Sequence, residues 1–149
     1  MVGRKSLKGD YCPSARPLDA IGDWWSLLIV RDAFDGLTRF GEFQKSLGIA
    51  KNILTERLRT LVARGILEAV PVGDGGARME YRLTAMGRDL FPVMVALRQF
   101  GERHLFKPGE AHSELVDRET GLPVRLDIRT PDGRSVGPDD TVLLKVPEE

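Results

Sequence analysis

Residues 38–82 constrain the fold more than any other part of this 149-residue chain, because they predict two helices and then a hairpin. An apolar stripe indicates the first helix, for which Thr38 is the candidate N-cap. A short break precedes the second helix, which is expected over residues 51–64 and ends at Gly65. Two amphipathic helices around a tight turn, followed by two strands, are typical of a winged helix-turn-helix.

The second predicted helix has two unlike faces. Leu54, Leu58, Leu61 and Val62 gather on one side. The candidate DNA-binding residues on or beside the opposite face are Lys51, Asn52, Thr55, Glu56 and Arg59. In a major groove, Asn pairs with adenine, Arg with guanine, and Glu accepts from cytosine. A phosphate at the helix start would meet Lys51 and free backbone amides. The alternative is an ordinary solvated face, and this helix alone does not separate the two interpretations.

The strands that follow favour the DNA-binding interpretation. Residues 65–72 lead into a glycine-rich turn, and residues 78–83 return with strict alternation. Arg78 and Arg82 share one face of the returning strand, where they are candidates for phosphate contacts that fix register and affinity. Arg39, at the start of the first helix, completes the set of DNA-binding candidates. The alternative is a hairpin with charged outer residues, but its place directly after the helix pair favours a wing.

The order of these motifs resembles the HxlR family of bacterial regulators. The motifs that carry the resemblance are Ile21-Gly22-Asp23-Trp24-Trp25, Arg39-Phe40-Gly41-Glu42-Phe43, Leu54-Thr55-Glu56-Arg57-Leu58 and Tyr81-Arg82-Leu83-Thr84-Ala85-Met86-Gly87. The similarity extends over residues 11–105. It implies a homodimeric winged-helix transcription factor related to the MarR group, with repression as the usual mode of action.

Charge is distributed unevenly, although the formal net charge is zero. Residues 1–106 hold sixteen Lys or Arg and twelve Asp or Glu, whereas residues 107–149 hold six and ten. The basic excess therefore lies on the part expected to meet DNA. No apolar run is long enough for a membrane span, and the first residues lack a signal-peptide core, so a cytoplasmic location is expected.

The segments on either side of the helix-turn-helix predict a core helix and a dimerisation helix. Residues 17–34 predict a central core helix, and an apolar stripe between residues 90 and 105 predicts a long terminal helix. Because a small domain cannot bury such a stripe alone, we expect a homodimer that binds a palindromic operator. The alternative is a helix packed on its own domain.

The expected fold is α+β, mainly α, with domains 1–106 and 107–149. The second domain is expected to be a small β extension, with strands at 113–117, 124–129 and 141–146.

Cys12 is the only cysteine, so no intrachain disulfide can form. Its place near Arg16 and the arm with Lys5 and Lys8 predicts a lowered thiol pKa. In several members of the resembled family a cysteine here senses electrophiles or oxidants, which makes Cys12 the redox-sensing candidate. The alternative is an inert, buried cysteine.

Catalysis is not expected. The only histidines, His104 and His112, lack metal-ligand spacing, no phosphate-binding glycine loop follows a strand, and the acidic residues form no catalytic constellation. The sequence therefore predicts a DNA-binding regulator without a cofactor or metal, acting with a small molecule or thiol modification as signal. The alternative is a winged-helix module that binds protein or ligand and has lost DNA binding.

Overall fold

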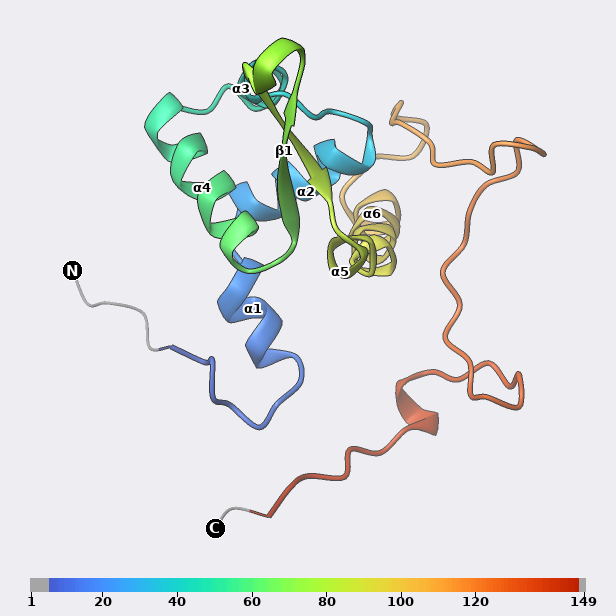
Figure 1. Cartoon of the computed structure of the whole chain (residues 1–149). Helices are drawn as coiled ribbons and strands as arrows, with labels where there is room; N and C mark the ends of the chain where they lie inside the picture. The colour runs from blue at the N-terminus through green and yellow to red at the C-terminus, as the bar shows by residue number, and fades with distance from the viewer. Residues whose placement is uncertain (1–5, 148–149) are drawn as a thin grey trace. The chain divides into compact units, whose positions relative to one another are not determined.

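A computed structural model describes residues 6–147, and Figure 1 shows the order of their elements. The elements are α1 (Ala15–Ile21), α2 (Trp24–Phe34), α3 (Phe40–Leu47), α4 (Lys51–Ala63), β1 (Leu67–Val72), η1 (Asp74–Gly76), β2 (Arg78–Leu83), α5 (Ala85–Arg88), α6 (Phe91–His104) and η2 (Pro138–Asp140). The chain divides into two compact units, one ending at Phe91 and the other beginning at Pro92. The division falls after the first residue of α6, so all but Phe91 of this helix belongs with the C-terminal extension. Among the described helices, none has the length and apolar character to cross a bilayer.

The core of the first unit brings together the apolar faces of four elements. The side chains buried to 1% exposure or less are Ile29 and Val30 of α2, Phe43 of α3, Leu54, Leu58 and Leu61 of α4, and Leu67 of β1. Their spacing puts one face of each helix inward. The predicted leucine face of the second helix is thus confirmed, with Val62 only half-buried beside it.

The end of α4 is set by Gly65, as the sequence predicts. Gly65 has φ +78°, a conformation that residues with a side chain rarely adopt. Its amide donates to the Val62 carbonyl, and the amide of Ile66 donates to the Leu61 carbonyl, each at 3.0 Å. This pair of bonds is the Schellman motif, which satisfies carbonyls that the helix leaves without partners. The chain then turns directly into β1.

The hairpin is antiparallel, with register from Leu67 opposite Leu83 to Val72 opposite Arg78. It contacts α2 and α4, and in Figure 1 it lies across α2 and beside α4. The amide of Tyr81 donates to the Thr38 carbonyl at 2.7 Å, so the segment before α3 is bonded to the outer edge of β2. The predicted helix, break, helix and hairpin are confirmed in this order.

Two sequence predictions are wrong in detail at the first helices. The core helix expected over residues 17–34 is two helices, because Asp23 is extended (ψ 147°) and its carboxylate caps α2 by accepting from the Ser26 amide. Thr38 does not cap α3. The N-cap is Arg39, and the carboxylate of Glu42 accepts from its amide at 3.0 Å. A glutamate at the third helical position can therefore replace the expected threonine cap.

The long terminal helix expected between residues 90 and 105 is confirmed as α6, which has 14 residues. Leu90 and Leu105 lie just outside it, and the short α5 precedes it. In the described part of 107–149 the three expected strands do not form. Only isolated bridges join Val116 to Pro123 and Arg129 to Ser135.

Candidate nucleic-acid interface

The outer face of α4 is uncovered. Its five candidate residues, Lys51, Asn52, Thr55, Glu56 and Arg59, are all exposed, whereas Leu54 and Leu58 between them are 0% and 1% exposed. Burial of the leucines fixes the rotation of the helix about its axis. The sequence therefore places the polar residues outward by placing the leucines inward.

The first turn of α4 is open to an anion. Its N-cap, Ala50, has no side-chain cap bond. Among the described residues, no side chain accepts from the amides of this turn. These amides, with the helix dipole and the exposed Lys51, suit a phosphate oxygen.

Two residues of this face are held by local contacts. The Thr55 hydroxyl donates to the Lys51 carbonyl at 2.8 Å, so it is engaged within its own helix. Glu56 lies 3.6 Å from a guanidinium nitrogen of Arg57, but its side chain remains 69% exposed. For Asn52 and Arg59, no side-chain partner is found among the described residues. The two side chains best suited to base recognition are thus free.

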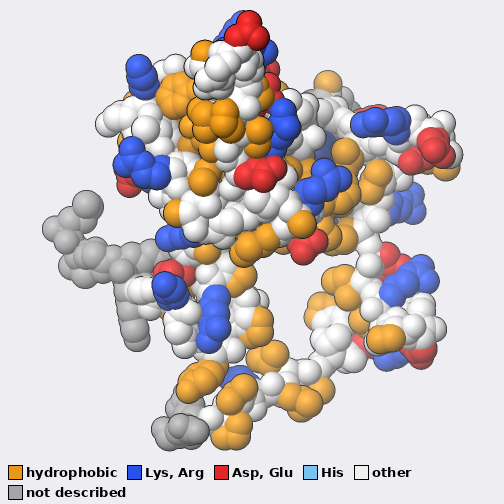
Figure 2. Space-filling model, viewed as in Figure 1, with side chains coloured by type: hydrophobic (Ala, Val, Ile, Leu, Met, Phe, Trp, Pro, Cys, Tyr) orange, Lys and Arg blue, Asp and Glu red, His pale blue; other side chains and the backbone are white. Residues whose placement is uncertain are grey.

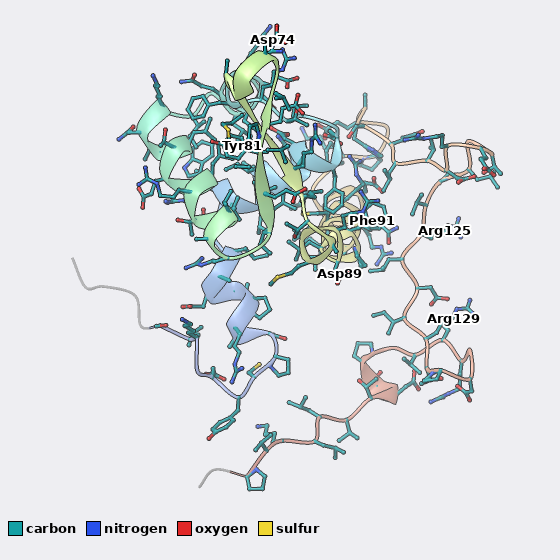
Figure 3. All side chains as sticks on the ribbon, in the orientation of Figure 1. Asp74, Tyr81, Asp89, Phe91, Arg125 and Arg129 are labelled. Atoms are coloured by element: carbon teal, nitrogen blue, oxygen red, sulfur yellow. The ribbon has the colours of Figure 1, made fainter. Side chains whose placement is uncertain are left out.

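The hairpin presents its two arginines differently. Arg78 is exposed, at the point where β2 leaves the turn. Arg82 is also exposed but is paired with Glu80, with 2.8 Å between Nη2 and Oε2. Figure 3 shows that Asp74 lies at the tip of the hairpin and Tyr81 farther along the strand. Arg82 is therefore engaged by a carboxylate, whereas Arg78 has no acidic partner among the described residues.

The eight DNA-binding candidates come from three neighbouring parts of the first unit. Arg39 is the exposed N-cap of α3, five residues lie on α4, and two lie on β2. Sequence reasoning missed one part of the site, the support of α4 by Asp23, whose carboxylate accepts from Arg57 Nε at 3.1 Å. The sequence does contain one indication of this role, because Asp23 stands three residues before Ser26, which is the spacing of a helix N-cap.

Cys12 is exposed and precedes α1, so the alternative of a buried cysteine is wrong. Hydrogen bonds from the backbone amides of Ser14 and Ala15 lower the pKa of its thiol below the ordinary value. The predicted direction is confirmed, but its cause is helix-start amides rather than cations. Arg16 is occupied instead, donating to the Asp10 carbonyl at 2.7 Å, and Lys5 lies outside the described residues.

These features define a winged helix-turn-helix: two helices on a buried frame, a polar outward face on the second, and a hairpin with exposed arginines beside it. The chain belongs to the HxlR-like helix-turn-helix family, whose pattern matches residues 20–108. The resemblance stated from the sequence motifs is thereby confirmed.

Relatives with similar sequences are named HTH-type transcriptional regulators. An uncharacterised HTH-type transcriptional regulator of Mycobacterium tuberculosis, MT3179, is 46% identical over 93 residues, which cover 62% of this chain and 59% of that relative. The chain thus spans less than two thirds of the length of this relative. Members of this family are regulators of transcription, a class that is not enzymatic.

Solved structures agree with the fold. The candidate transcription factor PA1607 is 58% identical, with TM-score 0.87 over 93% of this chain and 97% of that one. The redox regulator HypR in its reduced form is 33% identical, with TM-score 0.59 over 63% and 94%. A candidate regulator of the MarR family from Enterococcus faecalis V583 is 31% identical, with TM-score 0.52 over 59% and 81%.

Proposed function

We propose that this protein is a sequence-specific, DNA-binding transcriptional regulator that acts as a homodimer on a palindromic operator in the cytoplasm. One observation carries the proposal: α4 buries Leu54, Leu58 and Leu61 completely while its five polar candidates remain exposed. A helix that is rigidly seated and carries free Asn and Arg side chains outward suits a major groove. Membership of a helix-turn-helix family supports the same function.

Each contact has a distinct role in this proposal. Asn52 and Arg59 recognise bases, and Thr55 and Glu56 line the groove beside them. Lys51, Arg39, Arg78 and Arg82 contact phosphates, which set the position of the protein without selecting sequence. Affinity should therefore fall steeply with salt.

The dimer is supported by the exposed apolar side chains of α6. Val93, Leu97 and Phe100 recur at helical spacing and are 44%, 50% and 60% exposed. A stripe of this kind on a soluble chain marks an association surface. A twofold dimer would present two copies of α4, as a palindrome requires. Repression is the mode of action that we propose, since a dimer on an operator can block polymerase.

The signal that we favour is modification of Cys12. Its thiol is exposed and its pKa is lowered, which are the two conditions for oxidation by peroxide or attack by electrophiles. The relative HypR is named a redox regulator. A hollow in the second unit, about 110 Å³ in volume and lined in part by Gln99 and Val124, has less space than typical ligand pockets, which argues against an effector there.

A mobility-shift assay tests DNA binding. The DNA is the region upstream of the gene for this protein, at low and moderate salt, with the double variant Asn52→Ala/Arg59→Ala beside wild type. We expect wild type to shift this fragment and the double variant to lose at least tenfold in affinity. Arg125→Ala, in the C-terminal extension (Figure 3), is the matched loss of a cation and should bind like wild type.

The competing function is a winged-helix module for protein or ligand binding. It would be favoured if wild type shifted no genomic fragment at low salt while remaining a folded dimer. Equal binding by the double variant, with its circular dichroism unchanged, would remove α4 as the recognition element.

A further inference from the structure

The C-terminal arm, defined here as Thr141–Val146, is an extended and exposed apolar segment. Val142, Leu143, Leu144 and Val146 are 84%, 73%, 89% and 59% exposed. Within the described residues, the backbone from 142 to 146 makes no hydrogen bond. Figure 2 shows hydrophobic side chains along this end of the chain. Single exposed apolar residues are ordinary, but four in five residues on unpaired backbone mark a contact surface.

A second uncovered apolar surface lies in the same unit, on α6. Val93, Leu97 and Phe100 are spaced by four and three residues and form one stripe, with the ring of His104 4.9 Å from that of Phe100. The opposite side of the helix is occupied. Val95 is 4% exposed there, in the wall of the hollow that residues 112–124 help to form.

That opposite side is where the extension is attached. The Gln99 amide pairs with the extended backbone, donating to the Val124 carbonyl at 3.1 Å and accepting from the Leu126 amide at 3.2 Å. Arg98 donates to the Ser113 carbonyl at 2.7 Å and to its hydroxyl at 2.9 Å. The chain therefore covers one side of its own α6 and leaves the stripe to another occupant.

The arm is long enough to cover the stripe and complements it in charge. From Val93 to Phe100 the stripe runs about 11 Å along α6, and the six extended residues of the arm span about 20 Å. Asp139 and Asp140 precede the arm, and Glu148 and Glu149 follow it in the sequence. Beside the stripe, Arg103 and Lys107 are exposed cations at the C-terminal end of α6. An apolar segment with acidic flanks thus suits an apolar stripe with cations at its end.

We propose that the arm of each chain lies along the α6 stripe of the second copy in the dimer. This exchange rests on the proposed homodimer and specifies what covers its helix. In a single folded chain both surfaces are bare, although both belong to one unit. In a twofold dimer each arm and each stripe finds its complement, so the exchange buries both surfaces twice. The apolar arm is then part of the dimer interface rather than a DNA-binding surface.

Cysteine cross-linking tests the exchange. In full chains carrying Cys12→Ser, one tagged copy receives Leu97→Cys and a co-expressed copy with a different tag receives Leu144→Cys. We expect mild oxidation to give a covalent dimer that contains both tags, because a disulfide requires the two Cβ atoms within about 4.5 Å. Replacing Leu144→Cys by Thr120→Cys, in an exposed turn of the extension, should abolish it.

The same experiment has outcomes that overturn the proposal. A covalent dimer formed by Leu97→Cys chains alone shows that the stripes pack on each other. One formed by Leu144→Cys chains alone shows that the arms pair together. A chain with both cysteines that closes its disulfide internally, and forms no mixed dimer, shows that the arm lies on its own helix.

A second measurement keeps this inference separate from the proposed function. In sedimentation, Val142→Ser/Leu144→Ser should raise the dimer dissociation constant at least tenfold, and Leu122→Ser, outside the arm but 64% exposed, should leave it unchanged. If the arm variant dimerises and shifts DNA like wild type, the arm inference falls and the regulator stands. If the wild-type chain is a monomer that shifts no DNA, both fall.

Discussion

Arg57 of α4 donates from Nε to Oδ2 of Asp23, the residue that caps α2, across 3.1 Å. The same carboxylate accepts from the amide and the hydroxyl of Ser26, at 3.0 and 2.6 Å. One side chain therefore begins a core helix and bonds the helix that carries the proposed DNA-binding face. Its substitution should affect both stability and the seating of that face.

The two roles of Asp23 can be separated by substitution. Asp23→Ala removes the cap and the ion pair, and we expect it to lower the free energy of unfolding by about 1–2 kcal/mol. Asp23→Asn keeps an oxygen that can cap the helix and should lose less. Denaturant unfolding of the two variants beside wild type measures the difference. Equal losses would show that the cap contributes nothing beyond the charge.

The charge on Asp23 also predicts how stability depends on pH. Partial burial raises the pKa of Asp23, but the hydrogen bonds from Ser26 and Arg57 outweigh it, so the pKa lies below the ordinary value. A lowered folded pKa favours the charged form. The stability it adds is present above the unfolded pKa, about 3.9, and is lost as pH falls through the lower folded value. The difference in unfolding free energy between wild type and Asp23→Asn should therefore shrink in acid. A difference that grows as pH falls from 5 would contradict this sign.

Gly87 has no room for a side chain. A Cβ built on it would lie 2.2 Å from the Ile66 carbonyl oxygen, an atom that also accepts from the Thr84 amide at 3.1 Å. We expect Gly87→Ala to lower the free energy of unfolding by about 1–3 kcal/mol, since backbone must move. Gly101→Ala is the matched control. It lies within α6 with nothing within 4 Å of its Cβ, and the change should stabilise by about 0.5–1 kcal/mol. Thermal unfolding of both variants checks the opposite signs.

Salt dependence distinguishes phosphate contacts from base contacts. If Arg78 contacts a phosphate in each subunit, Arg78→Ala should reduce the slope of log affinity against log salt by about 0.9 per subunit. Its relative preference among operator sequences should not change. Titrations at several salt concentrations measure the slope, with Arg118→Ala of the extension as the matched control. If the Arg78 variant keeps the salt slope of the wild type, the hairpin does not contact the DNA phosphates.

The thiol of Cys12 should react as a thiolate at lower pH than an ordinary cysteine. Hydrogen bonds from the Ser14 and Ala15 amides hold its pKa low, and these bonds exist only while the start of α1 is folded. The pH midpoint of alkylation by iodoacetamide should lie lower in the native protein than in the chain unfolded by urea. Identical midpoints would remove the structural basis for sensing. Cys12→Ser, which should not be labelled, confirms that the signal belongs to this residue.

The sequence predicts most accurately where a pattern is repeated within one element. In α4, Leu54, Leu58 and Leu61 recur at helical spacing, so periodicity alone identifies the inner and outer faces. Gly65 ends the helix through its own backbone freedom, which needs no distant contact. The sequence does not predict the break at Asp23, because the apolar pattern continues across it. The carboxylate that caps α2 also accepts a hydrogen bond from Arg57, 34 residues away, and local periodicity cannot reveal such a contact.

The extension shows the opposite case. Residues 141–146 have the composition of a strand, but a strand exists only where another backbone completes its hydrogen bonds, and the described chain offers none. Local periodicity therefore determined the helix-turn-helix and its outward residues from the sequence alone. Tertiary structure decided which carboxylate supports α4, which arginine is left unpaired, and which side of α6 is uncovered, because each depends on contacts between residues far apart in the chain.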